Sequence, residues 1–213
     1  MNKKTSNEIL DILNKIIINP KPELDFTNNF ELLCAVMLSA QTTDKRVNIV
    51  TKELFLKYPT SKELMNAKVD DVKKIIHSLG FSNTKAINLI EMSKILESKY
   101  NGIVPNTLSE LETLPGCGHK TASVVLALGY NIPALPVDTH LYRMAKRLGY
   151  IKNNETIKDA EESFKKYIPM DMWIHAHHLF LLFGRYHCKA KLESCNGCSL
   201  MSYCKEKNKH LKN

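Results

Sequence analysis

Apolar residues recur every three or four positions along almost the whole chain, and this spacing constrains the fold more than any other feature. It is clear in residues 9–17, 32–37 and 47–54. Such spacing gathers apolar side chains on one face of an α-helix. No segment shows the strict alternation between hairpin turns that is typical of a half-buried strand. The sequence therefore predicts an all-α protein.

Several helix starts carry a capping-box pattern, in which a threonine is followed three residues later by a glutamate. The three pairs are Thr5 with Glu8, Thr60 with Glu63, and Thr107 with Glu110. Further helices are expected at about 70–78, 83–99, 119–129, 139–148, 155–167 and 171–187.

The segment YNIPALPVDTH, residues 130–140, is the best candidate for a boundary. Pro133 and Pro136 interrupt any continuous helix there. The N-terminal helix is too short to be a domain and is expected to pack on the C-terminal half. We therefore expect a central helical domain over 23–132 and a discontinuous second domain made of 1–22 and 133–213.

The chain of 213 residues has a formal net charge of +8. Over half of this excess lies from Arg185 onward, where seven Lys or Arg residues meet two glutamates. A basic surface favours polyanions such as nucleic acid or acidic lipid. A solvated, lysine-rich face is the alternative that charge alone leaves open.

Hydropathy argues against a membrane protein. No apolar run approaches the roughly 20 residues that a spanning helix needs. The first residues, MNKKTSNEILDIL, lack the apolar core of a signal peptide. We expect a cytoplasmic protein with no membrane partner.

The segment LETLPGCGHKTASVVLAL, residues 111–128, predicts two short helices joined by a glycine turn. Gly116 and Gly118 permit a tight turn with positive φ. The unit, a helix–hairpin–helix over about 107–129, would aim the N–H groups of Gly118 and its neighbours at a phosphate. An αα turn without a ligand is the alternative. A phosphate-binding P-loop is excluded, because one residue separates the glycines and a helix precedes them.

Lys120 stands where the second hairpin helix begins. An ordinary lysine amine has a pKa of about 10.4 and is protonated at neutral pH. Partial burial and a helix N-terminus both disfavour the charged form, which would suit an attacking amine. From position alone, an exposed lysine that binds phosphate is the favoured interpretation.

Asp138 precedes the predicted helix over 139–148 in the segment PVDTHLYRMAKRLG. Aspartate is a preferred N-cap, so a structural role is sufficient to explain it. A carboxylate that faced Lys120 would also give a nucleophile an electrostatic and proton-transfer partner. The two roles are compatible.

Four of the six cysteines follow the spacing C-x6-C-x2-C-x5-C, at Cys188, Cys195, Cys198 and Cys204. Disulfides are disfavoured in an intracellular chain. Structural zinc usually takes two paired knuckles, and only one C-x2-C occurs here. A [4Fe–4S] cluster held by four thiolates is modestly favoured over zinc. Cys34 and Cys117 are interpreted as ordinary buried thiols.

With these segments in order, the sequence closely resembles the endonuclease III family of DNA glycosylase/AP lyases, within the helix–hairpin–helix–GPD superfamily. The resemblance spans almost the whole chain. It is carried by LSAQTTD (38–44), LPGCGHKTA (114–122), VDTH (137–140), HHLFLLFGRYHC (177–188) and the cysteine spacing. It implies two helical lobes flanking a DNA-binding cleft, and a [4Fe–4S] loop over 188–204.

The resemblance also implies an activity and its residues. The protein would be a monomer acting on double-stranded DNA in base excision repair. It would remove oxidised pyrimidines through a Schiff base and nick 3′ to the AP site by β-elimination. Lys120 would be the nucleophile and Asp138 its assisting carboxylate. Gln41 would fill the gap that the flipped nucleotide leaves in the DNA. The loop of Leu79, Gly80 and Phe81 would wedge against the opposite strand. The other residues expected to contact DNA are Gly116, Gly118, His119, Thr121, His140, Lys189 and Lys191.

This sequence departs from the family pattern at three of these contacts. Phe81 replaces an aliphatic residue, Ser82 stands where tyrosine is frequent, and His119 stands where arginine is frequent. The departures bear on the wedge, on one phosphate contact and on substrate preference, and leave the chemistry in place.

Three other interpretations compete. A monofunctional glycosylase of the same superfamily would lack the lysine. A non-catalytic DNA-binding module would use the hairpin for phosphates alone, and Lys120 together with Asp138 argues against it. Residues 175–178, HAHH, suggest a metal site, but packing is favoured because no carboxylate or third ligand accompanies His175 and His178.

Overall fold

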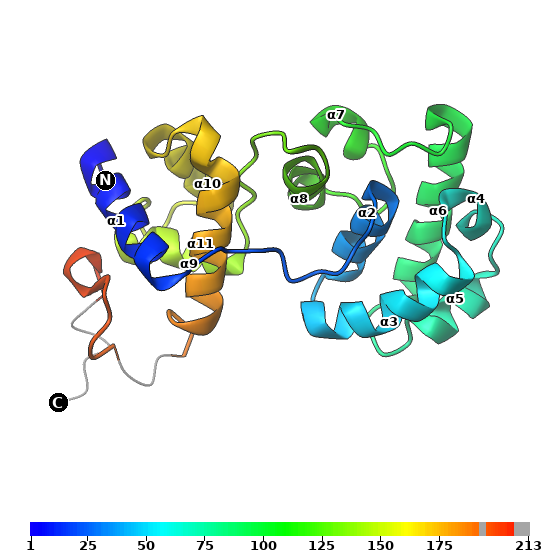
Figure 1. Ribbon diagram of the computed structural model, residues 1–213, viewed down its shortest axis with the longest axis horizontal. Helices are drawn as coiled ribbons and strands as arrows, with labels where there is room; N and C mark the ends of the chain where they lie inside the picture. The colour runs from blue at the N-terminus through cyan, green and yellow to red at the C-terminus, as the bar shows by residue number, and fades with distance from the viewer. Residues whose placement is uncertain (192–194, 207–213) are drawn as a thin grey trace. The chain divides into compact units, whose positions relative to one another are not determined.

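The computed structural model describes residues 1–191 and 195–206, which form helices and connecting turns without a strand (Figure 1). The chain divides into two compact units, one of Pro22–Ile132 and one of Met1–Lys21 with the described residues from Pro133 onward. The first holds α2 (Asn29–Leu38), α3 (Asp44–Lys57), α4 (Ser61–Leu64), α5 (Val69–Ile75), α6 (Ser82–Tyr100), α7 (Leu108–Leu111) and α8 (His119–Tyr130). The second holds α1 (Lys3–Ile16), α9 (Thr139–Leu148), α10 (Ile157–Tyr167), α11 (Trp173–Tyr186) and the 3-10 turns Met170–Met172 and Met201–Tyr203.

The helix starts show where local sequence decided the structure. At α4 both halves of the predicted capping box with Thr60 are present. At α7 the Thr107 hydroxyl accepts from the backbone N–H of Glu110. The predicted start at Thr5 is wrong: Asn2 caps α1, its side chain accepts from the N–H of Thr5, and Thr5 lies inside the first turn. Asparagine caps as well as threonine does, so the earlier cap extends the helix.

The unit Pro22–Ile132 is built around α2. This helix, NFELLCAVML, is buried over most of its length, and a helix that is apolar on every side belongs in a core. It packs against α8, α6 and α3, and α4 and α5 pack on α6 (Figure 1). The central position of α2 places the segment that follows it, residues 39–43, beside the start of α6.

The second unit is formed by both ends of the described chain. Helix α11 packs on α9 and on α1, and α10 packs on α9. Its core contains an aromatic cluster in which the Tyr150 ring lies 4.5 Å from that of Phe164 and 5.9 Å from that of Phe180. The buried Tyr150 hydroxyl is 2.7 Å from the Ser6 hydroxyl of α1. The first helix is thus an integral part of this core.

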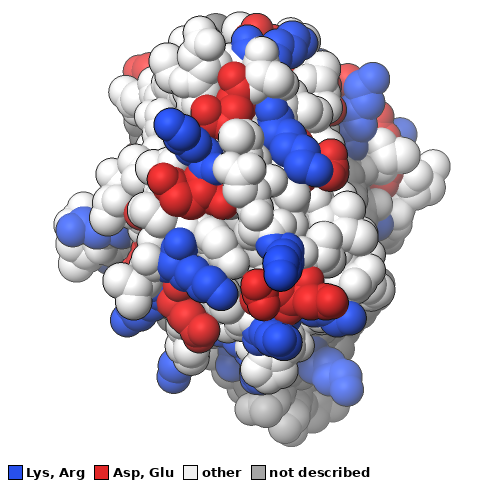
Figure 2. Space-filling view, turned by 90° about the vertical axis from the view of Figure 1, so that its right-hand side faces the viewer, with Lys and Arg blue, Asp and Glu red and all other residues white. Residues whose placement is uncertain are grey.

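The distribution of charged side chains and the hydropathy of the helices bear on possible partners. On the face shown in Figure 2, Lys and Arg side chains lie next to Asp and Glu side chains, so the positive excess is not concentrated on that face. Across the part of the chain that the structure describes, no helix has both the length and the apolar character needed to span a membrane.

Candidate functional site

The glycine turn between α7 and α8 uses its two glycines differently. Gly116 has φ +78°, and a Cβ there would lie 2.8 Å from the Asn88 side-chain nitrogen. Gly118 has φ −81° and open space around it. Gly116 therefore supplies the positive φ expected of this turn, and Gly118 supplies the expected absence of a side chain. The missing side chain of Gly118 leaves the backbone open to a close approach by another molecule.

Lys120 is the second residue of α8, and Gly118 is the N-cap of that helix. No side chain caps this end, so the first turn keeps its positive dipole end and its N–H groups for other partners. Lys120 itself is exposed. This is the exposure that the favoured interpretation of its position predicts, and the partial burial considered for an attacking amine is not found.

The two residues beside Lys120, His119 and Thr121, differ in exposure and in hydrogen bonding. The Nδ1 atom of His119 lies 2.8 Å from the Glu112 carboxylate, and both side chains are largely exposed. Any phosphate at His119 must compete with that carboxylate. Thr121 is half-buried on the next position of the helix.

Asp138 caps α9, as the sequence predicts. Its Oδ1 accepts from the N–H of His140 at 2.8 Å and of Leu141 at 2.9 Å. Both cap bonds go to one oxygen, so Oδ2 takes no part in the cap. The side chain is half-buried. One carboxylate can therefore hold the helix start and still present a charged oxygen. His140 is half-buried, and its Nδ1 lies 3.2 Å from an Arg143 guanidinium nitrogen.

Four exposed non-glycine residues of the described unit Pro22–Ile132 adopt left-handed backbone conformations. Asn101 and Asn131 end α6 and α8, and the other two are predicted DNA contacts. Gln41 has φ +57° and Phe81 has φ +58°. The Phe81 side chain is 67% exposed, whereas Leu79 is 1% exposed and belongs to the core. Of the three residues of the predicted wedge loop, Phe81 is thus the exposed large side chain, and Leu79 is packed in the core.

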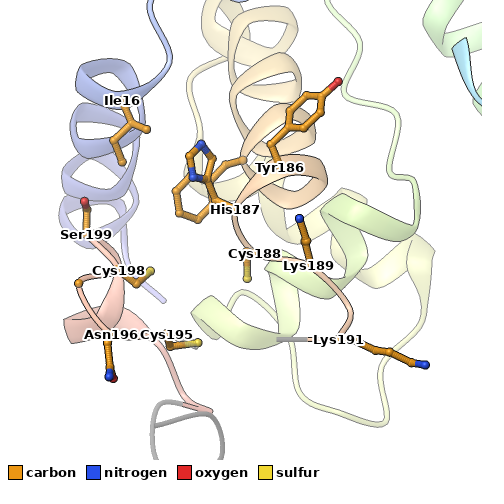
Figure 3. Close-up of a pocket in the computed structure, with 12 residues that line it drawn as sticks. Ile16, Tyr186, His187, Cys188, Lys189, Lys191, Cys195, Asn196, Cys198 and Ser199 are labelled. Carbon is orange, nitrogen blue, oxygen red and sulfur yellow. The ribbon is translucent and has the colours of Figure 1, made fainter. Parts of the chain in front are cut away.

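The four loop cysteines come together after α11. They line one cavity with apolar side chains of α9 and the loop. Figure 3 shows the sulfur atoms of Cys188, Cys195 and Cys198 pointing toward one another across an adjoining pocket, while Lys191 points away. Burial and the neighbouring thiols raise the pKa of Cys195, and burial raises that of Cys204.

The spacing of these sulfurs bears on what they could hold. Among the described residues, no three side chains of His, Cys, Asp or Glu converge closely enough for a single metal ion. Four thiolates are a donor set that suits either a tetrahedral zinc ion or a [4Fe–4S] cluster. The four cysteines line one cavity, as residues that hold a common group would.

Two arginines of α9 hold this loop, and the sequence reasoning missed them. Arg147 is 7% exposed at its side chain, donates to the Cys188 sulfur at 3.1 Å, and donates to the Glu206 carboxylate at 3.2 Å. Arg143 donates to the Cys188 carbonyl at 2.9 Å. Arginines four residues apart share a helix face, which was the available signal.

The remaining candidates have structural roles. His175 is 2.6 Å from the Asn14 side-chain oxygen, and His177 is 2.9 Å from the Pro136 carbonyl. His178 is buried, and burial lowers its pKa. Packing of the HAHH segment is confirmed. Cys34 and Cys117 are buried thiols, and burial raises the pKa of Cys117 to about 12.

Comparison with known proteins agrees with this set of features. The model of the HhH-GPD superfamily base excision DNA repair proteins matches residues 34–170. This stretch includes the glycine turn, Lys120 and Asp138. The chain belongs to the HhH-GPD superfamily. The matched residues end before Cys188, so the cysteine loop lies outside them.

The relatives of this HhH-GPD chain are similar over its full length. Endonuclease III of Rickettsia felis is 43% identical over 208 residues, covering 98% of this chain and 97% of the relative. Endonuclease III of Bacillus subtilis is 39% identical over 209 residues, covering 98% and 95%. A solved structure described as a trapped endonuclease III–DNA covalent intermediate has a TM-score of 0.95 and 41% identity, with 98% of each chain covered. A thermostable thymine-DNA glycosylase, 21% identical with a TM-score of 0.84, shares the fold.

Proposed function

We propose that this HhH-GPD protein is a bifunctional DNA glycosylase and AP lyase of base excision repair. It removes oxidised pyrimidines from double-stranded DNA and nicks the strand 3′ to the AP site. The observation that carries the proposal is Lys120, an exposed amine at the start of α8, where no side chain caps the helix. A solved structure of a related endonuclease III is described as a trapped covalent intermediate with DNA, which supports a reaction through a covalent protein–DNA bond.

The proposed reaction begins when the neutral Lys120 amine attacks C1′ of the damaged nucleotide. A carbon–nitrogen bond forms, and the glycosidic bond breaks with its electron pair leaving on the base, which takes up a proton. The attached nitrogen loses a proton, and the C1′–O4′ bond of the sugar ring then opens, with O4′ taking up a proton, to leave an open-chain iminium. This iminium acidifies the C2′ proton. Loss of that proton expels the 3′ phosphate by β-elimination, and water then releases the lysine. At an AP site the amine enters the same route without losing a base.

Asp138 is proposed to assist as a carboxylate. One of its oxygens is committed to the cap of α9, so the charge is held in a fixed direction. A preorganised negative charge stabilises the cationic sugar and iminium that develop in the reaction. It can also accept a proton from the lysine ammonium.

DNA is proposed to bind through the glycine turn, the left-handed loops and the basic segment after α11. Helix N-termini bind phosphate through their N–H groups and their dipole. Gln41 would occupy the space of the flipped nucleotide, and Phe81 would wedge the opposite strand. The further contacts are Gly80, Gly116, Gly118, His119, Thr121, His140, Lys189 and Lys191.

We also propose that Cys188, Cys195, Cys198 and Cys204 hold a [4Fe–4S] cluster. The support is the C-x6-C-x2-C-x5-C spacing and the cavity that the four cysteines line in common. When bound, the cluster would fix the shape of the loop, because four cysteines along the loop would all be attached to one rigid group. The protein residues alone carry the reaction, and the loop presents Lys189 and Lys191 to DNA.

Borohydride trapping tests the activity directly. The protein is mixed with duplex DNA that contains a thymine glycol or an AP site, and sodium borohydride is added. A stable protein–DNA adduct is expected with both substrates, since borohydride reduces an imine to an amine. Base release without an adduct or strand cleavage would favour a monofunctional glycosylase, and the absence of base release, adduct and cleavage would favour a binding module.

A further inference from the structure

Lys85, in the first turn of α6, is a buried lysine. It is 8% exposed, and burial lowers its pKa. None of the ion pairs found among the described residues includes it. Its ammonium group instead donates to two backbone carbonyls, those of Leu38 and Ala40, each at 2.9 Å. A buried cation is costly unless it is hydrogen-bonded, so this position calls for an explanation.

The two carbonyls belong to the end of α2 and the loop that follows. The Leu38 carbonyl is at the negative end of the helix dipole, where a cation is favoured. The Ala40 carbonyl directly precedes Gln41. Lys85 therefore ties the loop of Gln41 to α6 across 45 residues of sequence.

Lys85 lies one helical turn after Phe81, the left-handed N-cap of α6. Its backbone N–H donates to the Phe81 carbonyl at 3.0 Å in the ordinary helical pattern, a bond that does not depend on the side chain. Outside glycine, the left-handed conformation is unfavourable, and it persists where the surrounding structure determines it. Gln41 and Phe81 both adopt it and both are exposed. The Lys85 side chain thus anchors the loop of Gln41 to the first turn of the helix whose N-cap is Phe81.

The glycine turn before α8 also lies next to Lys85. A small cavity is lined by Lys85, Asn88 and Gly116, together with residues at the end of α2. The Asn88 side chain fills the space where a Cβ of Gly116 would lie. The end of α2, the start of α6 and the turn before α8 therefore converge within one unit.

We propose that Lys85 is a positioning residue for nucleotide flipping, which fixes the loops of Gln41 and Phe81 relative to each other before DNA binds. The proposal rests on the proposed function. Lys85 acts through the backbone carbonyls and need not touch DNA. Its loss should allow the two loops to move independently, so that insertion and wedging no longer occur together.

Lys85→Met tests this, because methionine keeps an unbranched apolar chain and removes the charge and the donors. Lys94→Met is the matched control: Lys94 lies on the same helix, is exposed, and pairs with Glu91 at 2.8 Å. The reaction is trapped with borohydride on an AP site in duplex DNA and on an AP site in single-stranded DNA. Only the duplex requires the nucleotide to be extruded.

We expect Lys85→Met to slow trapping on the duplex by about 10- to 100-fold, since misplacing a group by about 1 Å can cost 10²-fold. On single-stranded DNA the rate should stay within about twofold. Fluorescence of 2-aminopurine opposite an AP-site analogue should also show less base displacement on the duplex. Lys94→Met should match the parent in every assay.

Equal losses on both substrates, or no loss on the duplex, would overturn the proposal. If Lys85→Met does not fold, Lys85→Gln, which keeps an amide donor, is measured in the same way and should show a smaller loss confined to the duplex. Failure of both variants to fold would make Lys85 a stability residue and would also overturn it. A parent protein that forms no adduct on either substrate would instead disprove the proposed function.

Discussion

Single residues at helix starts carry the chemistry proposed for this protein, and they do so for different reasons. Lys120 occupies a start with no side-chain cap, where a cation gains nothing from the helix dipole. Asp138 occupies a start that it caps itself. A lysine can be removed from such a place without loss of packing, while an aspartate can be replaced by another capping residue. Each can therefore be tested for chemistry apart from stability.

Lys120→Ala is expected to fold like the parent, because the side chain is exposed and surface substitutions change stability by about 0.5 kcal/mol or less. It should bind damaged DNA but lose the borohydride adduct and nearly all strand cleavage. Thermal melting and trapping gels measure the two effects. If the variant still formed the adduct, another amine would be the nucleophile.

Asp138→Asn should keep the α9 cap, because asparagine caps as well as aspartate does. Base removal should slow by about 10²–10³, the usual cost of losing one preorganised electrostatic group. Single-turnover kinetics measure the rate. Thr156→Ala, which removes the cap of α10, should lower stability by about 1 kcal/mol without that loss of rate. Similar rates for Asp138→Asn and the parent would remove Asp138 from the mechanism.

At the scale of elements, the glycine turn offers a matched pair of substitutions. Gly116→Ala should destabilise the protein by at least about 1–2 kcal/mol, because alanine resists positive φ and its Cβ would meet Asn88. Gly118→Ala should cost less, up to about 1 kcal/mol, because its φ is ordinary and the space is open, and only the preference for glycine over alanine at an N-cap is lost. It should nevertheless weaken DNA binding, since a methyl group would stand where the phosphate approaches.

Denaturant melts and binding titrations separate these two effects. Loss of stability in Gly118→Ala equal to that in Gly116→Ala would mean that both glycines serve the fold. Unchanged binding by Gly118→Ala would place the phosphate elsewhere.

The four cysteines of the loop lead to a prediction of the metal content of the purified protein. Purified protein should be brown, with broad visible absorption and about four irons per chain, as four thiolates around a [4Fe–4S] cluster require. Iron and zinc analysis after anaerobic preparation measures this. Cys34→Ser, which alters a buried thiol outside the loop, should keep the iron, and Cys198→Ser should lose most of it. Stoichiometric zinc without iron would contradict the cluster.

The sequence predicted features of these elements that depend on neighbouring residues, and it did not predict features that depend on residues far away in the sequence. The bounds of α9 follow from a local cap at Asp138 and a glycine at its end, and they were predicted to the residue. The burial of Leu79 was not predicted, because it depends on packing within the unit. Lys85 and Arg147 were also missed. Their partners lie about 40 or more residues away, and no local pattern records such contacts.

At the scale of the whole molecule, charge sets how the protein meets DNA. Lys189 and Lys191 are exposed beside the cysteine loop. Replacing both with alanine should lower the slope of log K against log salt by up to about 2, since each phosphate contact releases counterions. Binding titrations at several salt concentrations measure the slope.

The control is the double variant Lys62→Ala with Lys94→Ala, which also removes two positive charges. Both lysines are exposed on helices, and each lies near a glutamate. This pair should leave the slope as it is. An unchanged slope in the loop variant would show that the loop does not touch the DNA backbone.

The second unit joins the first helix to residues that come more than a hundred positions later, and this has a consequence for synthesis. During translation α1 leaves the ribosome first, but its partners in α11 are made long afterward. The unit Pro22–Ile132 can complete its core in the meantime, since units tend to fold in the order in which they emerge. Until then Ile9, Leu10 and Leu13, which are buried in the finished protein, have no core to enter. The helix made earliest is thus among the last to be buried, and a nascent chain would present it to chaperones throughout that interval.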